Sequence, residues 1–166
     1  MKNINYVEGK QILIVDDEPD VLDTLEDLLP NCKTDRATSF EDAKKLLESR
    51  HFDMAVLDIM GVDGYKLLEI CTRRNVVAVM LTARAFSVED TVKSFQGGAA
   101  YYVPKDEMAK IETFLNEILE AYQKAQSPWI RWLKRFTPYY DARFGPDWQH
   151  RDKEFWDKFL ERYSYW

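Results

Sequence analysis

Cysteine is scarce in this sequence, which contains two residues of this type, Cys32 and Cys71, in a chain of 166. No Cys-x-x-Cys pair and no Cys/His spacing is present, so the sequence gives little support to a structural zinc site. Each cysteine stands alone in an apolar context. We therefore expect both to be buried free thiols in a reducing compartment.

Long hydrophobic runs are also missing. The longest purely apolar stretch, Val76–Leu81, is far too short to span a bilayer. Residues 1–6 lack the apolar core of a secretory signal. We expect a cytoplasmic protein that does not insert into a membrane.

Positive charge is in short supply, because the formal net charge is -6 at pH 7. Residues 1–126 contain 15 Lys/Arg and 23 Asp/Glu (-8), whereas residues 127–166 contain 8 and 6 (+2). The mildly basic C-terminal part is far from the basic stripe of a nucleic-acid-binding domain, and it has no convincing helix-turn-helix pattern. We expect no nucleic-acid partner.

Short apolar runs alternate with helical patterns through the first three-quarters of the chain. The clearest runs cover residues 11–15, 54–57, 76–81 and 99–103, and a weaker one covers 33–37. Between and after them, apolar residues recur at helical spacing. This alternation predicts five βα units that form a parallel α/β sheet.

The composition changes at Ser127-Pro128, where a helix cap is followed by a proline suited to a first helical turn. We therefore divide the chain into a domain of residues 1–126 and a C-terminal helical extension of residues 127–166. The extension holds every tryptophan of the chain: Trp129, Trp132, Trp148, Trp156 and Trp166.

Two apolar stripes at helical spacing occupy the extension, and Thr137-Pro138 and Gly145-Pro146 lie between them. Such stripes are typical of core, so one interpretation is that the extension folds back on the first domain or forms a helical pair. The other is an aromatic interaction surface for self-association or for another protein.

Charged and polar residues stand where the predicted strands end. The acidic pair Asp16-Asp17, then Asp58, Thr82 and Lys105, each fall at or just after an apolar run. Parallel sheets bind ligands at the carboxyl ends of their strands, so these side chains should converge on one edge. Carboxylates so close together repel each other unless a cation or proton intervenes. The pattern indicates a divalent-metal site beside a phosphoryl site.

Magnesium prefers oxygen ligands and keeps several waters. Asp17 and Asp58 are the best side-chain candidates for Mg²⁺, and Asp16 would act directly or through water. The backbone carbonyl of Met60, just past Asp58, is a candidate for completing the protein's share of ligands.

Asp58 is also the candidate nucleophile, which would attack phosphorus and form an aspartyl-phosphate. Lys105 would neutralise a phosphoryl oxygen, and the Thr82 hydroxyl would donate to another. Ala83 is small and leaves room beside the phosphoryl group.

Four segments together carry a family resemblance: residues 12–18 (ILIVDDE), 56–64 (VLDIMGVDG), 80–84 (MLTAR) and 98–105 (GAAYYVPK). Over roughly residues 8–125 the chain resembles the CheY-like receiver domain of two-component response regulators. The resemblance implies a flavodoxin-like (βα)₅ doubly wound parallel sheet with strand order 2-1-3-4-5.

The resemblance also implies roles for particular residues. It makes Asp58 the phosphoacceptor, places Asp16 and Asp17 at Mg²⁺, and puts Thr82 and Lys105 in contact with the phosphoryl group. Tyr102 falls at the position of the family's switch aromatic. Two positions depart from the usual pattern, since Val62 and Asp106 stand where receivers usually have proline, and the segment after Asp58 is shorter than usual.

The resemblance implies a two-component response regulator. A sensor histidine kinase or a histidine phosphotransfer protein would supply the phosphoryl group, and the output would be a switched protein–protein surface. The alternative is a phosphorylation-independent scaffold with a receiver fold. A turnover enzyme is the weakest interpretation, because the sequence shows neither an added substrate pocket nor a general acid.

Overall fold

The computed structural model of this chain describes residues 4–83 and 86–163. Arg84 of the 80–84 motif and Trp166 therefore lie outside the described residues. Five parallel strands form one sheet in the order β2-β1-β3-β4-β5, as predicted. The strands are β1 (Gln11–Val15), β2 (Lys33–Ala37), β3 (Met54–Asp58), β4 (Val77–Thr82) and β5 (Tyr101–Pro104).

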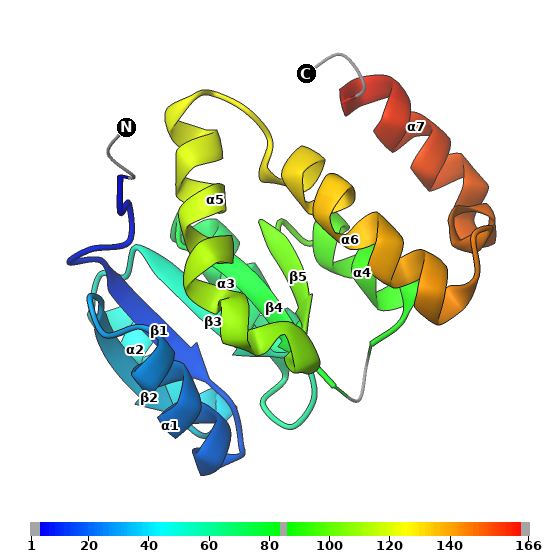
Figure 1. Cartoon of the computed structure of the whole chain (residues 1–166). Helices are drawn as coiled ribbons and strands as arrows, with labels where there is room; N and C mark the ends of the chain where they lie inside the picture. The colour runs from blue at the N-terminus through cyan, green and yellow to red at the C-terminus, as the bar shows by residue number, and fades with distance from the viewer. Residues whose placement is uncertain (1–3, 84–85, 164–166) are drawn as a thin grey trace.

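Helices cover both faces of this sheet (Figure 1). On one face α1 contacts α5, and on the other α2 contacts α3. The α-helices are α1 (Pro19–Leu28), α2 (Phe40–Ser49), α3 (Gly64–Arg73), α4 (Val88–Gln96), α5 (Ile111–Gln123), α6 (Pro128–Phe144) and α7 (Lys153–Tyr163), and the 3₁₀ helices are η1 (Lys105–Lys110) and η2 (Trp148–Asp152). This arrangement is the flavodoxin-like (βα)₅ fold with added C-terminal helices.

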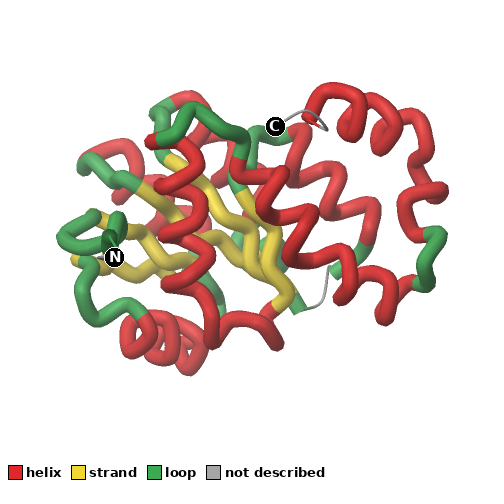
Figure 2. The backbone as a smooth tube through the Cα atoms, turned by 45° about the horizontal axis from the view of Figure 1, so that its top comes forward, coloured by secondary structure: helices red, strands yellow, loops and turns green. Residues whose placement is uncertain are grey.

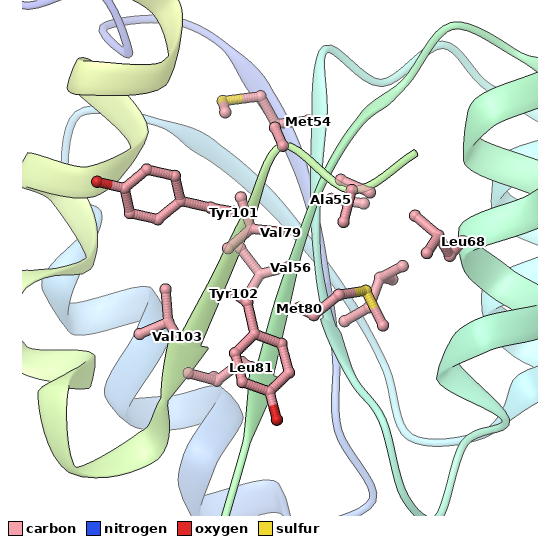
Figure 3. Close-up of a cluster of buried hydrophobic side chains, with 14 of the residues drawn as sticks. Met54, Ala55, Val56, Leu68, Val79, Met80, Leu81, Tyr101, Tyr102 and Val103 are labelled. Carbon is pink, nitrogen blue, oxygen red and sulfur yellow. The ribbon is translucent and has the colours of Figure 1, made fainter. Parts of the chain in front are cut away.

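The middle of the sheet is apolar because helices bury both of its faces. Every residue of β3 is buried, and the core side chains of β3, β4 and β5 meet there (Figure 3). Parallel pairing sets Asp58 beside Leu81 and Thr82 beside Pro104. The predicted site residues at these strand ends therefore come together at the carboxyl end of the sheet.

Several helices begin at residues that favour a helix start, among them the predicted Ser127-Pro128. Pro19 occupies the first turn of α1, and the Ser39 hydroxyl accepts a hydrogen bond from the Asp42 amide at the start of α2. Ser127 caps α6 in the same way, through the amide of Trp129. Each cap satisfies a backbone donor that the first helical turn leaves open.

The two edges of the sheet differ in character. β2 is polar and partly exposed, which protects an open edge from pairing with other chains. β5 is fully buried, because α6 lies along it and fills the space between α4 and α5 (Figures 1 and 2). The indole N–H of Trp129 donates to the Ala99 carbonyl (2.7 Å), and that of Trp132 to the Tyr102 carbonyl (2.8 Å).

The extension therefore folds back on the (βα)₅ domain. The side chains that it buries are Trp129, Trp132, Phe136, Tyr140, Trp148, Trp156 and Phe159, all at most 4% exposed. These side chains belong to the core, so the structure does not present them as an open interaction surface. Helix α6 continues through Pro138 and ends before Gly145. The break between the two apolar helices therefore lies at Gly145-Pro146, and not at Thr137-Pro138.

Both cysteines are free thiols, with Cys71 buried and Cys32 half-buried. Among the described helices, none combines the length and the hydropathy that crossing a bilayer requires.

Replacing Trp132 with Phe should destabilise the fold, because the Tyr102 carbonyl would lose its donor while remaining buried. Trp156→Phe is the matched control, since the Trp156 indole N–H is buried without a hydrogen-bond partner among the described residues. We expect W132F to lose about 1–2 kcal/mol more unfolding free energy than W156F in urea titrations. Equal losses would show that the hydrogen bond to β5 contributes nothing.

Candidate functional site

The ammonium group of Lys105 lies among carboxylates at the carboxyl edge of the sheet. Its Nζ is 2.8 Å from Asp16 Oδ2, 3.5 Å from Asp58 Oδ1 and 3.7 Å from Glu18 Oε1. Asp16 directly follows β1, Asp58 ends β3, and Lys105 directly follows β5. The structure thus brings together side chains from three strand ends, as the sequence predicts.

Burial makes this charge cluster unusual, because Asp16 is 0% and Asp58 is 5% exposed. Desolvation, reinforced by the charge of Asp16, raises the pKa of Asp58 to about 7 despite the opposing effect of Lys105. Burial also raises the pKa of Asp16. Burial disfavours the charged form of Lys105, yet Asp16 and Asp58 together raise its pKa. The single ammonium group of Lys105 therefore offsets the negative charge of these carboxylates only in part.

Oxygen donors for a cation are present beside Lys105. Carboxylate oxygens of Asp16, Asp17 and Glu18 lie within 4.8 Å of one another, and Asp17 adds to the negative potential at Asp58. An all-oxygen set of this kind suits a small hard cation such as Mg²⁺. Glu18 was not among the predicted ligands, although its place directly after the acidic pair was a visible signal.

The turn after Asp58 fits tightly around these carboxylates. Gly61 has a φ of +88°, and a Cβ there would lie 2.5 Å from Asp17 Oδ2. The amide of Gly64 donates to the Ile59 carbonyl (3.0 Å), and Val62 is buried, so the short segment is an ordered turn. The Met60 side chain is 48% exposed, and its carbonyl as a ligand stays a prediction.

Thr82 and Ala83 lie at the same end of the sheet, whereas Tyr102 lies within β5. Thr82 is buried and Ala83 exposed, and both line a cavity of about 180 Å³ together with Lys105. Tyr102 is buried in the core, its hydroxyl accepts a hydrogen bond from the Ser87 amide (3.3 Å), and its ring stacks on Phe86. The roles of these residues in phosphoryl transfer and switching stay predictions.

Comparison with known proteins finds similarity to response regulators. The family model described as "Response regulator receiver domain" matches residues 12–116. Heme response regulator HssR of Staphylococcus aureus (strain JH9) is 39% identical over 102 residues, which cover 57% of this chain and 44% of that protein. Two-component response regulator ARR18 of Arabidopsis thaliana is 35% identical over 104 residues, covering 58% of this chain and 16% of that protein. The alignments thus span less than half the length of these curated relatives.

Solved structures of receiver domains share the fold. A CheY-like response regulator receiver domain protein from Methanospirillum hungatei JF-1 superposes with a TM-score of 0.58 and 30% identity, covering 68% of this chain and 98% of that one. The Francisella response regulator 1452 receiver domain gives a TM-score of 0.61 at 21% identity, covering 69% and 99%. The second likeness concerns the fold alone.

Gly61→Ala should weaken Mg²⁺ binding, because the added methyl group would displace the Asp17 carboxylate. Gly9→Ala is the matched control, since Gly9 also has a positive φ (+75°) but nothing lies within 4 Å of its Cβ position. Both variants should lose about 1 kcal/mol of stability from backbone strain. We expect only G61A to lose Mg²⁺ affinity, by about ten-fold in calorimetric titration, and unchanged affinity would contradict the tight fit.

Asp58→Asn should stabilise the protein in chelator-containing buffer at neutral pH, because it removes one of several crowded, buried carboxylates. We expect a gain of roughly 1–2 kcal/mol in urea unfolding. Mg²⁺ should stabilise the wild type more than D58N and so narrow the difference. Exposed Asp27→Asn serves as the control and should change little. A D58N variant less stable than wild type without metal would refute the crowding argument.

Proposed function

We propose that Asp58 of this chain, which belongs to the response regulator receiver domain family, accepts a phosphoryl group. The phosphorylated site then changes a surface that contacts another protein. The observation that carries the proposal is the Lys105 ammonium, which lies 2.8 Å from Asp16 and 3.5 Å from Asp58 at the end of three strands. A buried carboxylate can act as the nucleophile toward phosphorus, and a cation beside it can stabilise the negative charge of the transferred phosphoryl group.

The transfer itself asks little of the protein beyond positioning. A carboxylate oxygen of Asp58 attacks the phosphorus of a phosphohistidine, an acyl-phosphate bond forms, and the phosphorus–nitrogen bond of the donor breaks. The departing imidazole keeps the electron pair and takes up a proton. Lys105 pairs with an oxygen of the transferred group, and Thr82 donates to another. Ala83 leaves space at the mouth of the site.

The acidic residues would hold Mg²⁺. Asp16, Asp17 and Asp58 are the proposed side-chain ligands, with the Met60 carbonyl completing the set and Glu18 at its border. When bound, the metal supplies positive charge that offsets the repulsion between carboxylates and an incoming phosphoryl group. The fit of these oxygens to a hard cation and the raised pKa of Asp58 support this assignment.

The proposed donor is a sensor histidine kinase or a histidine phosphotransfer protein, and the proposed setting is the cytoplasm. Residues 1–126 act as the receiver domain and 127–166 as its extension, with Tyr102 as the switch aromatic. The output is a contact with a downstream protein or a second copy of this chain. We assign no turnover of a separate substrate, and the only reaction of the aspartyl-phosphate is its own hydrolysis.

Incubation with acetyl phosphate and Mg²⁺ should add one phosphoryl group, visible by intact-mass spectrometry. D58N should abolish the addition. Among the described residues, the other carboxylates that pair with Lys105 are those of Asp16 and Glu18, and both belong to the proposed metal-binding cluster. Asp27→Asn should phosphorylate like wild type. The phosphoryl mimic beryllofluoride should bind with Mg²⁺ to wild type and not to D58N.

Labelling that persists in D58N would place the phosphoacceptor elsewhere. A wild-type protein that binds neither beryllofluoride nor a phosphoryl group would favour the scaffold interpretation. Turnover of a phosphate ester beyond one equivalent would revive an enzymatic one.

A further inference from the structure

The C-terminal extension contacts the residue next to the site lysine. Asp106 directly follows Lys105 in η1, and the hydroxyl of Tyr139, on α6, donates to its carboxylate at 2.7 and 2.9 Å. Partial burial of the phenol, together with its hydrogen bond to Asp106 and the charge of that carboxylate, raises the pKa of Tyr139 to about 12. A helix outside the receiver fold is thus tied to the backbone that carries the ammonium group of the site.

A second contact joins the same helix to the other side of the site. Phe86, four residues after Thr82 in the chain, lies among aromatic rings of α6. Ring centroids lie 5.3–5.6 Å from that of Phe86 for Phe144, Tyr140 and Tyr139. The Arg143 guanidinium lies 5.6 Å from the centre of the Phe86 ring. The ring of Phe86 also stacks on that of Tyr102, with the two ring centroids 5.8 Å apart.

A cavity of about 180 Å³ lies where the two groups of residues meet. Its lining includes Thr82, Ala83 and Lys105 of the proposed phosphoacceptor site, and also Tyr139 and Arg143 of α6. Helix α6 therefore lines a cavity at the site and also covers β5.

We propose that Tyr139 is a positioning residue for the phosphoacceptor site, acting on Lys105 through Asp106, so that docking of α6 and loading of Asp58 oppose each other. This inference rests on the proposed function. In the described arrangement the Lys105 ammonium is closest to Asp16, and the bond from Tyr139 holds the adjoining residue in that arrangement. A phosphoryl group on Asp58 adds oxygens and negative charge that draw the ammonium toward them.

Movement of Lys105 displaces Asp106 from Tyr139, and an occupied site mouth presses on the Phe86 side of the same cavity. Loading therefore weakens the contacts that hold α6. By thermodynamic linkage the effect is reciprocal: a chain whose α6 docks less firmly loads more readily. A released α6 would uncover β5 and the aromatic side chains now buried against it, which supplies a surface that the closed form lacks.

Tyr139→Phe tests the coupling with little risk to the fold, because the ring and its aromatic contacts remain and only the hydroxyl is lost. We expect Y139F to bind beryllofluoride with Mg²⁺ about five-fold more tightly than wild type. Asp106→Ala should have a similar effect, and the double variant should add little, since both changes remove the same hydrogen bond. Tyr122→Phe, an exposed phenol on α5, is the matched control and should bind like wild type.

Hydrogen exchange gives an independent readout. In the full chain, beryllofluoride and Mg²⁺ should increase amide exchange in residues 128–163 relative to Mg²⁺ alone, and D58N should show no such increase. Beryllofluoride binding by wild type with unchanged exchange in α6 and α7, or equal affinity of wild type and Y139F, would overturn the coupling and leave the proposed function intact. Failure of wild type to bind beryllofluoride would overturn both.

Discussion

At the carboxyl end of the sheet, the ammonium group of Lys105 lies between two buried carboxylates and offsets part of their repulsion. Asp16 and Asp58 come from different strands, and without a cation their charges would oppose the packing of β1 beside β3. The raised pKa of Asp58 shows that one ammonium does not fully compensate the acids. The proposed divalent-cation binding and phosphoryl acceptance would both add positive charge or use the crowded carboxylate, so the feature that destabilises the fold locally is the one that the proposed function uses.

A second constraint is the treatment of the sheet edge at β5. Its residues are apolar, and an exposed edge of that kind invites pairing with other chains. Helix α6 covers this edge with tryptophan indoles that donate to backbone carbonyls, and ion pairs from Arg131 to Glu120 and from Arg135 to Glu117 join α6 to α5. The same helix lines the cavity beside Lys105, so one element protects the edge of the sheet and carries the proposed coupling to the site.

Much of the fold was predictable because its signals are local. Apolar runs, the caps at Ser39 and Ser127 and the first-turn Pro19 act within a few residues of sequence. The course of α6 was less predictable: Pro138 normally ends or bends a helix, yet α6 continues through it, because packing against α5 and β5 outweighs the lost hydrogen bond. Glu18 was overlooked at the site since an acidic residue at a helix start has an ordinary capping interpretation.

The amino-acid sequence alone predicted the parallel sheet, its strand order through the family resemblance, and the groups at the carboxyl ends of its strands, because those ends must meet. It also determined that the extension is aromatic and helical. The place where that extension packs is visible in the folded molecule alone, since an apolar stripe specifies burial without specifying a partner. The contact between Tyr139 and Asp106 joins residues 33 positions apart, and no local pattern encodes such a pairing.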